Sequence, residues 1–508
     1  MRYLCLVCFV SAVLGMALAP AGPADAQTAS DTDARLRLLE ATLQDLLARD
    51  QQKDRLIQQL QAELTRLRAG DRTPPHGTAG HADSHGHARA PTDARSRPEG
   101  GHDHTHGAHG AEGEGGGDLF AVEVGDGVTA RMKRIGVDVA LAAGYSSESE
   151  QETIEQLQGG GHDPRQNGFT VRTVDLSLIG GLDPFFDAEV HIAFFLDPEG
   201  ETKVELEEAF LRTQTTPIEL EVGQMFTEFG AFNPKHVHDW DWLDQPVVNT
   251  RMFGEDGIRG PGFRLGWTPV EHVTLHAGMQ NAKGETMVSF LSSDEAFEER
   301  PIGGRAFNER NVDSFEEFVY LARLATHFDV GGAHVDLGAS GLYGPNATGG
   351  DGETYIVGAD LTVNARLGET RYLRWQSEAM YRGYDADDDP ANGFVSDDLD
   401  DYGLYTQLLL GVNRAWAAGL RYEYVSGDGA SVGDFGDRDA DPFRSDRHRI
   451  SPLVQWQFAP TAKIRLQYNY DDADFLADGS DAHAVWLGFD WAFGAGSAGH
   501  GHGHGHAH

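Results

Sequence analysis

The stretch that decides the fold is His483 to Phe493, HAVWLGFDWAF, close to the end of the 508-residue sequence. From Val485 to Phe493 every second residue is apolar, and Gly488 and Asp490 fall between the apolar positions. A strand with one wet and one apolar face that ends in an aromatic residue is typical of the closing strand of a transmembrane β-barrel. If this segment closes a barrel, the preceding sequence should contain further strands of this kind.

The same alternation recurs throughout residues 133–493, for example where Leu466 and Tyr468 alternate with Arg465 and Gln467. It predicts strands near 133–144, 168–180, 184–196, 202–214, 217–226, 258–268, 271–281, 316–328, 333–344, 354–365, 371–384, 401–411, 416–426, 446–458, 461–471 and 482–493. Alternation alone does not separate a soluble sandwich from a barrel. The connections do, because short turns and long polar loops strictly alternate. We expect an all-β transmembrane barrel of about 16 antiparallel strands within residues 118–493.

The first residues have the features of an export signal. A basic Arg2, an apolar stretch and the A-x-A site at Ala24–Ala26 predict a signal peptide over 1–26. Cys5 and Cys8, the only cysteines, would leave with it. No later segment has the roughly 20 uninterrupted apolar residues that a membrane helix needs.

Two further segments precede the barrel. Residues 31–68 carry leucine and isoleucine at alternating steps of three and four, which predicts a coiled coil, with a trimeric stalk preferred. A single amphipathic helix packed on its own protein is the alternative. Residues 73–117 are rich in Gly, Ala, Pro and His without apolar periodicity, which predicts a disordered linker.

Thirteen of the 23 histidines lie in the linker or in the tail 494–508. Flexible imidazoles of this kind can gather around zinc, copper or nickel. Two alternatives to metal binding stay open: the histidines arose by neutral drift of a low-complexity sequence, or those at the C-terminus are a purification tag. The predicted metal-binding histidines of these two segments are His102, His104, His106, His109, His500, His502, His504 and His506.

The charge excludes some functions and favours others. Lys and Arg total 40 against 80 Asp and Glu, a formal net charge of −40. Such an excess argues against a nucleic-acid partner and for the attraction of cations. The sequence has no G-x-S-x-G elbow, no H-E-x-x-H and no P-loop, so we do not expect an enzyme.

The order of signal, coiled coil, porin-sized barrel and aromatic last strand resembles the phosphate-selective type of trimeric outer-membrane porin. The blocks VELEEAFL (204–211) and VGQMFTEFGAFNPKHVHDWDWLDQPVVNTRMFGEDGIRGPGFRLGW (222–267) are similar to a family of poorly characterised barrels linked to zinc handling. Some of those barrels carry a TonB-dependent receptor label, but this chain lacks room for a plug domain. The resemblance implies a homotrimer in the outer membrane of a Gram-negative bacterium. An even number of strands with short periplasmic turns would place both termini in the periplasm.

By the same resemblance, the third outer loop, residues 227–257, folds inward and narrows the pore. It contains His236, His238, Asp239, Asp241 and Asp244. Imidazole and carboxylate groups at this density suit zinc or a similar divalent ion, and the first four form the predicted metal ligands. A purely structural role, in which these groups hydrogen-bond the loop to the barrel, is the alternative.

Basic residues of several strands are expected to face the lumen. Opposed to the acids of the loop, they would create a transverse field across the constriction; alternatively, they neutralise carboxylates of the barrel interior. Those expected at the constriction are Arg264, Arg374, Arg421 and Arg465, with Arg382 and Lys463 also facing the lumen.

The outer loops are acidic, notably residues 385–401, 428–446 and 472–478. We expect a solvated rim that concentrates cations and contacts lipopolysaccharide through divalent ions, with a specific calcium site as the less favoured interpretation.

Together these features predict a passive outer-membrane channel for cations, zinc first, with histidine tails that capture metal in the periplasm and no required cofactor. Two alternatives stay open. One is a general or anion-selective (phosphate) porin with incidental histidines, and the other is a non-conducting metal-binding or structural barrel.

Overall fold

The computed structural model describes residues 118–125, 127–213, 217–390, 393–476 and 481–495. The predicted signal peptide, coiled coil and linker, and tail residues 496–508, lie outside these residues, so those predictions stay predictions. Within the described ranges, sixteen antiparallel strands close into a barrel and one further strand pairs at its edge.

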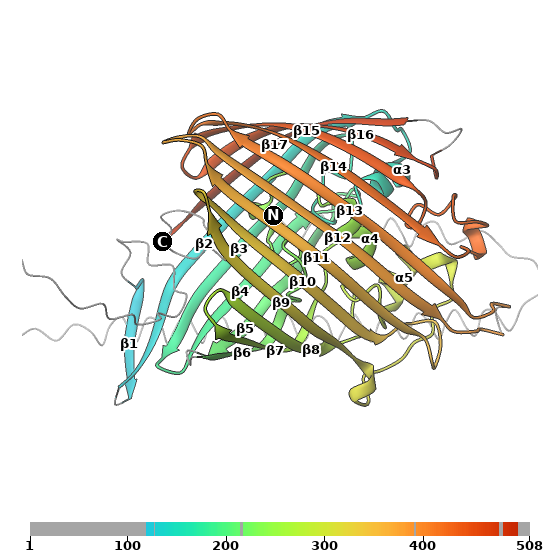
Figure 1. Cartoon of the computed structure of the whole chain (residues 1–508), viewed down its shortest axis with the longest axis horizontal. Helices are drawn as coiled ribbons and strands as arrows, with labels where there is room; N and C mark the ends of the chain where they lie inside the picture. The colour runs from blue at the N-terminus through green and yellow to red at the C-terminus, as the bar shows by residue number, and fades with distance from the viewer. Residues whose placement is uncertain (1–117, 126, 214–216, 391–392, 477–480, 496–508) are drawn as a thin grey trace, which may run out of the picture. The chain divides into compact units, whose positions relative to one another are not determined.

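The ring follows chain order, each strand pairing with the next (Figure 1). It closes where β17 pairs with β2, with Val485 opposite Tyr145. The strands are β1 (Phe120–Gly125), β2 (Val128–Ser146), β3 (Gly168–Asp183), β4 (Phe186–Leu196), β5 (Thr202–Thr213), β6 (Ile218–Phe226), β7 (Arg259–Val270), β8 (Val273–Asn281), β9 (Phe318–Val330), β10 (Ala333–Pro345), β11 (Glu353–Arg366), β12 (Tyr372–Ala386), β13 (Asp397–Gly411), β14 (Trp416–Asp428), β15 (Arg447–Ala459), β16 (Ala462–Ala473) and β17 (Asp481–Ala495).

The sixteen predicted strands are confirmed, and three differences have physical reasons. β1 was not predicted, because it is only six residues long and pairs with β2 alone. β2 begins at Val128 rather than 133, since residues 129–132 continue the ladder with β3 and also pair with β1. β13 begins at Asp397 rather than 401, because the ladder with β12 extends through residues whose acidic run is typical of a loop.

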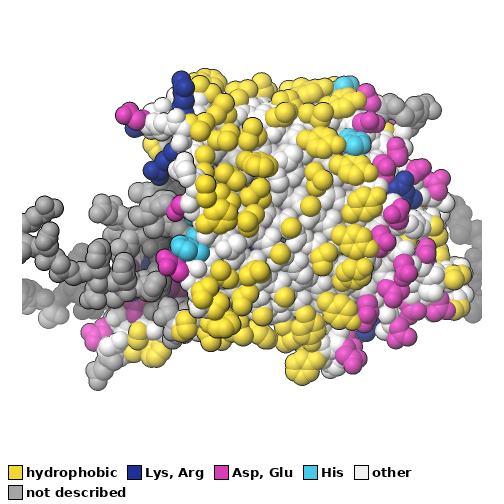
Figure 2. All heavy atoms as spheres, viewed as in Figure 1, with side chains coloured by type: hydrophobic (Ala, Val, Ile, Leu, Met, Phe, Trp, Pro, Cys, Tyr) yellow, Lys and Arg dark blue, Asp and Glu magenta, His cyan; other side chains and the backbone are white. Residues whose placement is uncertain are grey.

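The burial pattern is opposite to that of a soluble sandwich. On β17 the side chains of Val485, Leu487 and Trp491 are 45–50% exposed, whereas Trp486 between them is fully buried. Hydrophobic side chains cover the surface over the strands, and acidic ones gather at the end with the long loops (Figure 2). The fully buried large side chains include five inward-facing arginines of the strands, namely Arg172, Arg382, Arg421, Arg449 and Arg465. Apolar side chains outside and charged side chains inside are typical of a β-barrel embedded in a lipid bilayer.

The interior is filled largely by two long loops. The loop between β6 and β7 carries α4 (Val247–Phe253), and the loop between β8 and β9 carries α5 (Asp294–Glu299). Their side chains, among them Phe229 and Phe290, form one buried apolar cluster with inward residues of the strands. A shorter helix, α3 (Gln151–Leu157), lies in the loop after β2. Among the described residues, no helix has the length and apolar character required to cross a bilayer.

Candidate functional site

The loop between β6 and β7 lies inside the barrel and reaches the far side of the ring. The Leu243 N–H donates a hydrogen bond to the side chain of Gln467 on β16 (2.7 Å). The indole N–H of Trp242 donates to the carbonyl of Ser451 on β15 (3.0 Å). Because these partners are on strands about half the ring away from β6 and β7, the loop spans the lumen.

Asp244 holds this loop to the wall. Its carboxylate pairs with Arg421 and, at 3.2 Å, with Arg449. It also accepts hydrogen bonds from Gln467 (2.8 Å) and Asn469 (2.7 Å). The Asp244 and Arg421 side chains are 0% exposed, so these two residues of the predicted constriction anchor the loop and do not line an open passage.

The other basic residues of the predicted constriction are also paired with acids. Arg374 contacts Asp241 at 2.8 Å, and this pair is the most exposed, with 42% of the arginine accessible. The remaining ion pairs are Arg264 with Glu221 (2.6 Å) and Glu228 (2.9 Å), Arg465 with Asp490 (3.0 Å) and Arg382 with Asp401 (2.6 Å). Lys463 donates to the carbonyl of His238 at 3.3 Å. This pairing favours the interpretation that these cations neutralise interior carboxylates.

An irregularity in β5 brings two successive glutamates into the lumen. In the ladder with β4, His191 lies opposite Glu208 and Ile192 lies opposite Leu206, so Glu207 is an extra residue. Such a β-bulge re-aims side chains and interrupts alternation. Consequently Glu207 and Glu208 are both turned inward, while Leu206 before them is half exposed on the outer face.

The two glutamates flank His236 of the inward loop. Nδ1 of His236 lies 3.0 Å from Glu207 Oε2, and its Nε2 lies 3.1 Å from Glu208 Oε2. The His191 ring stacks on the His236 ring with 4.3 Å between centroids. Ligand atoms of His191, Glu208 and His236 all lie within 4.8 Å of one another. We call these three residues the inner group. An imidazole that donates from one nitrogen to a carboxylate can bind zinc through the other, and Glu207 is placed to accept from Nδ1 in that arrangement.

A second group lies nearby and comes from three different segments. His162 belongs to the loop after β2, Glu205 to β5, and Asp256 to the end of the inward loop. Their ligand atoms also lie within 4.8 Å of one another. We call them the outer group, because Glu205 precedes Glu208 on β5 and so lies nearer to the end with the long loops. Arg259 pairs with Glu205 at 2.5 Å and is the cation in direct contact with this group.

His238, also a predicted metal ligand, lies beside the inner group. Its ring is parallel to that of His236, with 5.6 Å between centroids. Its Nδ1 is 3.3 Å from Asp175 of β3, and its Nε2 is 3.7 Å from Asp239. The structure thus places His236 and His238 side by side, but Asp241 turns to Arg374 instead of joining them.

Excess negative charge shifts the pKa values of the loop residues at these groups. Burial disfavours the charged form of His162, but the carboxylate of Glu205 outweighs this and raises its pKa to about 10. Burial, followed by repulsion from Glu205, raises the pKa of Asp256 to about 7. The pKa of His236 lies well above its usual value because hydrogen bonds to Glu207 and Glu208 outweigh its burial. The site therefore favours bound positive charge.

Several predicted sites are not brought into this region or cannot be placed. The linker and tail histidines, His102 to His109 and His500 to His506, lie outside the described residues. In the acidic loops, arginines of the 428–446 loop pair with some of the aspartates, for example Arg444 with Asp401 (3.1 Å) and Arg438 with Asp446 (2.5 Å). Calcium binding at these loops stays a prediction.

The sequence contained signals for some of the residues that were missed. His191 occupies an inward position of a strand that was predicted correctly, between the inward Glu189 and Ala193. The adjacent acids of VELEEAFL indicate an interrupted alternation. His162 and Asp256 are 94 positions apart on loops, and no local pattern connects them.

Comparison with known proteins adds little about chemistry. No protein-family model matches the chain. An uncharacterized protein of Aquifex aeolicus (strain VF5) is 27% identical over 343 residues, which cover 63% of this chain and 68% of that protein. The outer membrane channel DcaP of Acinetobacter baumannii has a TM-score of 0.46 at 11% identity, with 72% of this chain and 98% of that chain covered. An anion-selective porin from Comamonas acidovorans has a TM-score of 0.44 at 12% identity, covering 72% of this chain and 100% of that one.

Proposed function

We propose that this chain is an outer-membrane channel through which divalent cations, zinc first, cross by binding in the lumen. The observation that carries the proposal is the convergence of His191, Glu208 and His236 within 4.8 Å inside the barrel. Two imidazoles and one carboxylate are a ligand set that zinc accepts while it keeps a position for water or a further ligand. A site of three ligands also suits conduction, since a transported ion must leave as well as bind.

The membrane location is supported by the outer surface. Apolar side chains cover it, and aromatic ones collect near both ends of the strands, as in the girdles of barrels that span a bilayer. At the end with the long loops they include Tyr145, Tyr320, Tyr343, Tyr355, Tyr422 and Tyr468. At the end with the short turns they include Trp267, Phe328, Trp375, Trp416, Trp456 and Trp491. In the proposal the long loops face outward and both termini are periplasmic.

The paired state of the lumen arginines favours cations over anions. An anion-selective filter needs basic groups whose charge is available, whereas Arg264, Arg374, Arg421 and Arg465 each contact a carboxylate. Around the inner and outer groups, the carboxylates of Glu205, Glu207, Glu208 and Asp256 converge, and apart from Arg259, which pairs with Glu205, the positive charge in direct contact with them is that of the imidazoles His162 and His236. Such a local excess concentrates cations.

The remaining features of the proposal are inferred from the sequence and concern the outer loops, the linker, the tail and the coiled coil. The acidic outer loops collect cations, weakly binding calcium and contacting lipopolysaccharide, and the histidines of the linker and tail capture metal in the periplasm. The coiled coil and the barrel wall assemble a homotrimer. None of these features is required for the lumen site to bind zinc.

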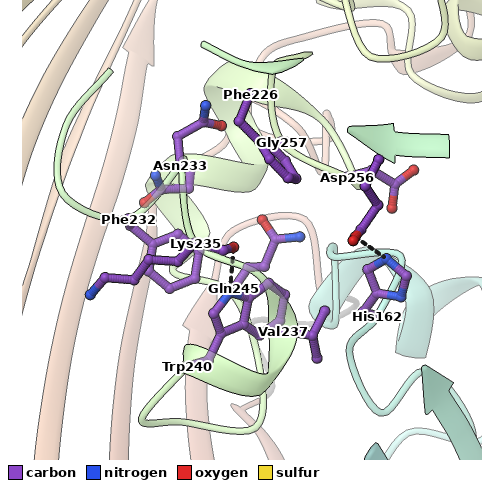
Figure 3. Close-up of a pocket in the computed structure, with 12 residues that line it drawn as sticks. His162, Phe226, Phe232, Asn233, Lys235, Val237, Trp240, Gln245, Asp256 and Gly257 are labelled. Carbon is purple, nitrogen blue, oxygen red and sulfur yellow. Dashed lines mark hydrogen bonds and ion pairs between the residues drawn. The ribbon is translucent and has the colours of Figure 1, made fainter. Parts of the chain in front are cut away.

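A non-conducting metal-binding barrel is the second candidate, and a specific observation favours it. The loops after β6 and β8 fill much of the lumen with apolar side chains such as Phe229, Phe253 and Phe290. Figure 3 shows a cavity beside the loop after β6, lined by residues that include His162, Phe226 and Lys235. Conduction would then require the loops to move.

Zinc uptake by proteoliposomes tests the proposal. The full chain should admit zinc into vesicles that hold a zinc-sensitive dye, and His236→Ala should reduce the initial rate at least tenfold. His483→Ala is the matched control, because His483 is an outward-facing histidine on β17 that contacts Tyr468. If the full chain admits no zinc although it binds zinc, the second candidate is correct. Equal uptake by wild type and His236→Ala would refute the role of the inner group.

A further inference from the structure

The outer group has a geometry that a purely structural cluster does not need. Nδ1 of His162 lies 2.9 Å from the carbonyl of Arg172 and can only donate to it. A metal ion that displaces the Nε2 proton would therefore bind the lone pair of Nε2, on the side of the ring that faces Glu205 and Glu207. A backbone carbonyl that fixes a histidine tautomer in this way is the usual support of a metal-binding imidazole.

Two buried atoms of the outer group lack hydrogen bonds within the described part of the chain. They are Nε2 of His162, whose side chain is 3% exposed, and Oδ1 of Asp256. Buried polar atoms are nearly always satisfied, because an unsatisfied one costs free energy. Both atoms belong to a set whose ligand atoms lie within 4.8 Å of one another, and Figure 3 shows the His162 and Asp256 side chains facing each other on the same side of the cavity, with a contact drawn between them. A cation bound between them would satisfy both at once.

Glu207 connects the outer group to the inner group. Its Oε1 lies 3.7 Å from Nε2 of His162, and its Oε2 lies 3.0 Å from Nδ1 of His236. The two oxygens of one carboxylate thus face one histidine of each group. The side chain is 2% exposed, so its position is fixed by its surroundings. The extra residue of the β5 bulge is what brings this carboxylate inward between the two groups.

We propose that the lumen holds two divalent-cation sites in series, the outer group His162–Glu205–Asp256 and the inner group His191–Glu208–His236, joined by the carboxylate of Glu207. This inference rests on the proposed function and specifies how its cargo is bound. An ion arriving at the outer site repels the ion at the inner site and promotes its release. Tight binding and rapid passage are combined in channels by such neighbouring sites.

The competing explanation is charge neutralisation by Arg259. Its guanidinium contacts Glu205 at 2.5 Å and already compensates one carboxylate of the outer group. Arg259 leaves Glu207 and Asp256 to be compensated by histidines, chiefly His162 and His236, and these contacts still leave His162 Nε2 without a hydrogen bond. The two explanations differ in whether a cation binds there, which can be measured.

Anomalous diffraction at the zinc absorption edge, from crystals of the full chain soaked in zinc, tests the inference. We expect two peaks in the lumen, one at each group. His162→Ala combined with Asp256→Asn should remove the outer peak and keep the inner one, and His236→Ala should remove the inner peak. His276→Ala, a half-buried histidine on β8 outside both groups, is the matched control and should keep both peaks. The difference in gel mobility between heated and unheated samples verifies that each variant forms a folded barrel.

The outcomes separate this inference from the proposed function. An inner peak without an outer peak in the wild type would overturn the two-site inference and leave the channel proposal standing. Absence of both peaks would overturn both. Solution binding supplies a second measurement, in which Glu207→Gln should weaken zinc binding by roughly 10–100-fold, the usual effect of removing a carboxylate that supports a metal-binding histidine. Unchanged affinity in Glu207→Gln would contradict its linking role.

Discussion

Asp244 should determine whether the inward loop stays docked across the lumen. Its carboxylate is fully buried, pairs with Arg421 and Arg449, and accepts from two amide side chains. Removing one partner of a buried ion pair costs about 3–5 kcal/mol, because the other charge is left buried without compensation. Arg421 and Arg449 retain Glu423 and Asp471, so the lower end of that range, about 3 kcal/mol, applies to Asp244→Ala.

That free energy is large compared with the stability of a docked loop. A loss of about 3 kcal/mol raises the ratio of undocked to docked loop roughly a hundredfold, since each 1.4 kcal/mol is a factor of ten. Planar-bilayer recordings of Asp244→Ala should show larger and more variable single-channel conductance than wild type. Limited proteolysis should cut between 227 and 257 faster in the variant, while the barrel strands stay protected.

Asp241→Ala is the matched control for this experiment. Asp241 is in the same loop, three residues earlier, and also pairs with an arginine of the wall, but 42% of Arg374 is exposed. Exposed pairs contribute about 0–1 kcal/mol, so conductance and proteolysis should change little. If Asp244→Ala and Asp241→Ala gave the same small effect, burial of the Asp244 cluster would not be what docks the loop, and the reasoning would be refuted.

Three further predictions concern the wall and its irregularities. Leu487→Arg puts a charge on the outer face of β17 and should destabilise the barrel. The free energy of unfolding in lipid vesicles, measured by denaturant titration against Leu487→Ala, should fall by up to about 2–4 kcal/mol. Deletion of Glu207 restores regular alternation in β5, so zinc affinity should fall at least tenfold while the barrel still forms; an unchanged affinity would show that the bulge is not needed. Gly488→Val should loosen the loop, because a Cβ there would lie 2.1 Å from Leu243, at a cost of about 1–3 kcal/mol; the check is faster proteolysis of the loop, which Val485→Ile, on the outer face of β17, should not match.

The fold could be predicted because it depends on a local sequence pattern, the alternation of apolar and polar residues along each strand. The period of two along β17, with Val485 and Leu487 outward, needs no knowledge of distant residues. The alternation of short turns and long loops then separated the barrel from a sandwich. The pattern failed where pairing with a neighbour extended a strand, as at Asp397 of β13.

The candidate site could be predicted only in part, because its ligands meet through tertiary structure. His236 was identified from the density of histidine and aspartate in its loop. Its partners Glu207 and Glu208 were missed, since a bulge turns both inward where strict alternation allows only one. His162 and Asp256 approach each other only because two loops fold into the same lumen. Linear spacing carries no information about such a contact.

The reversal potential across a planar bilayer that separates two concentrations of zinc chloride tests the central claim most directly. If zinc crosses through the inner group, the potential of the full chain should have the sign of a cation-selective pore, and His236→Ala should shift it toward zero. A potential of the opposite sign, or the absence of any conductance from pure protein, would contradict the account.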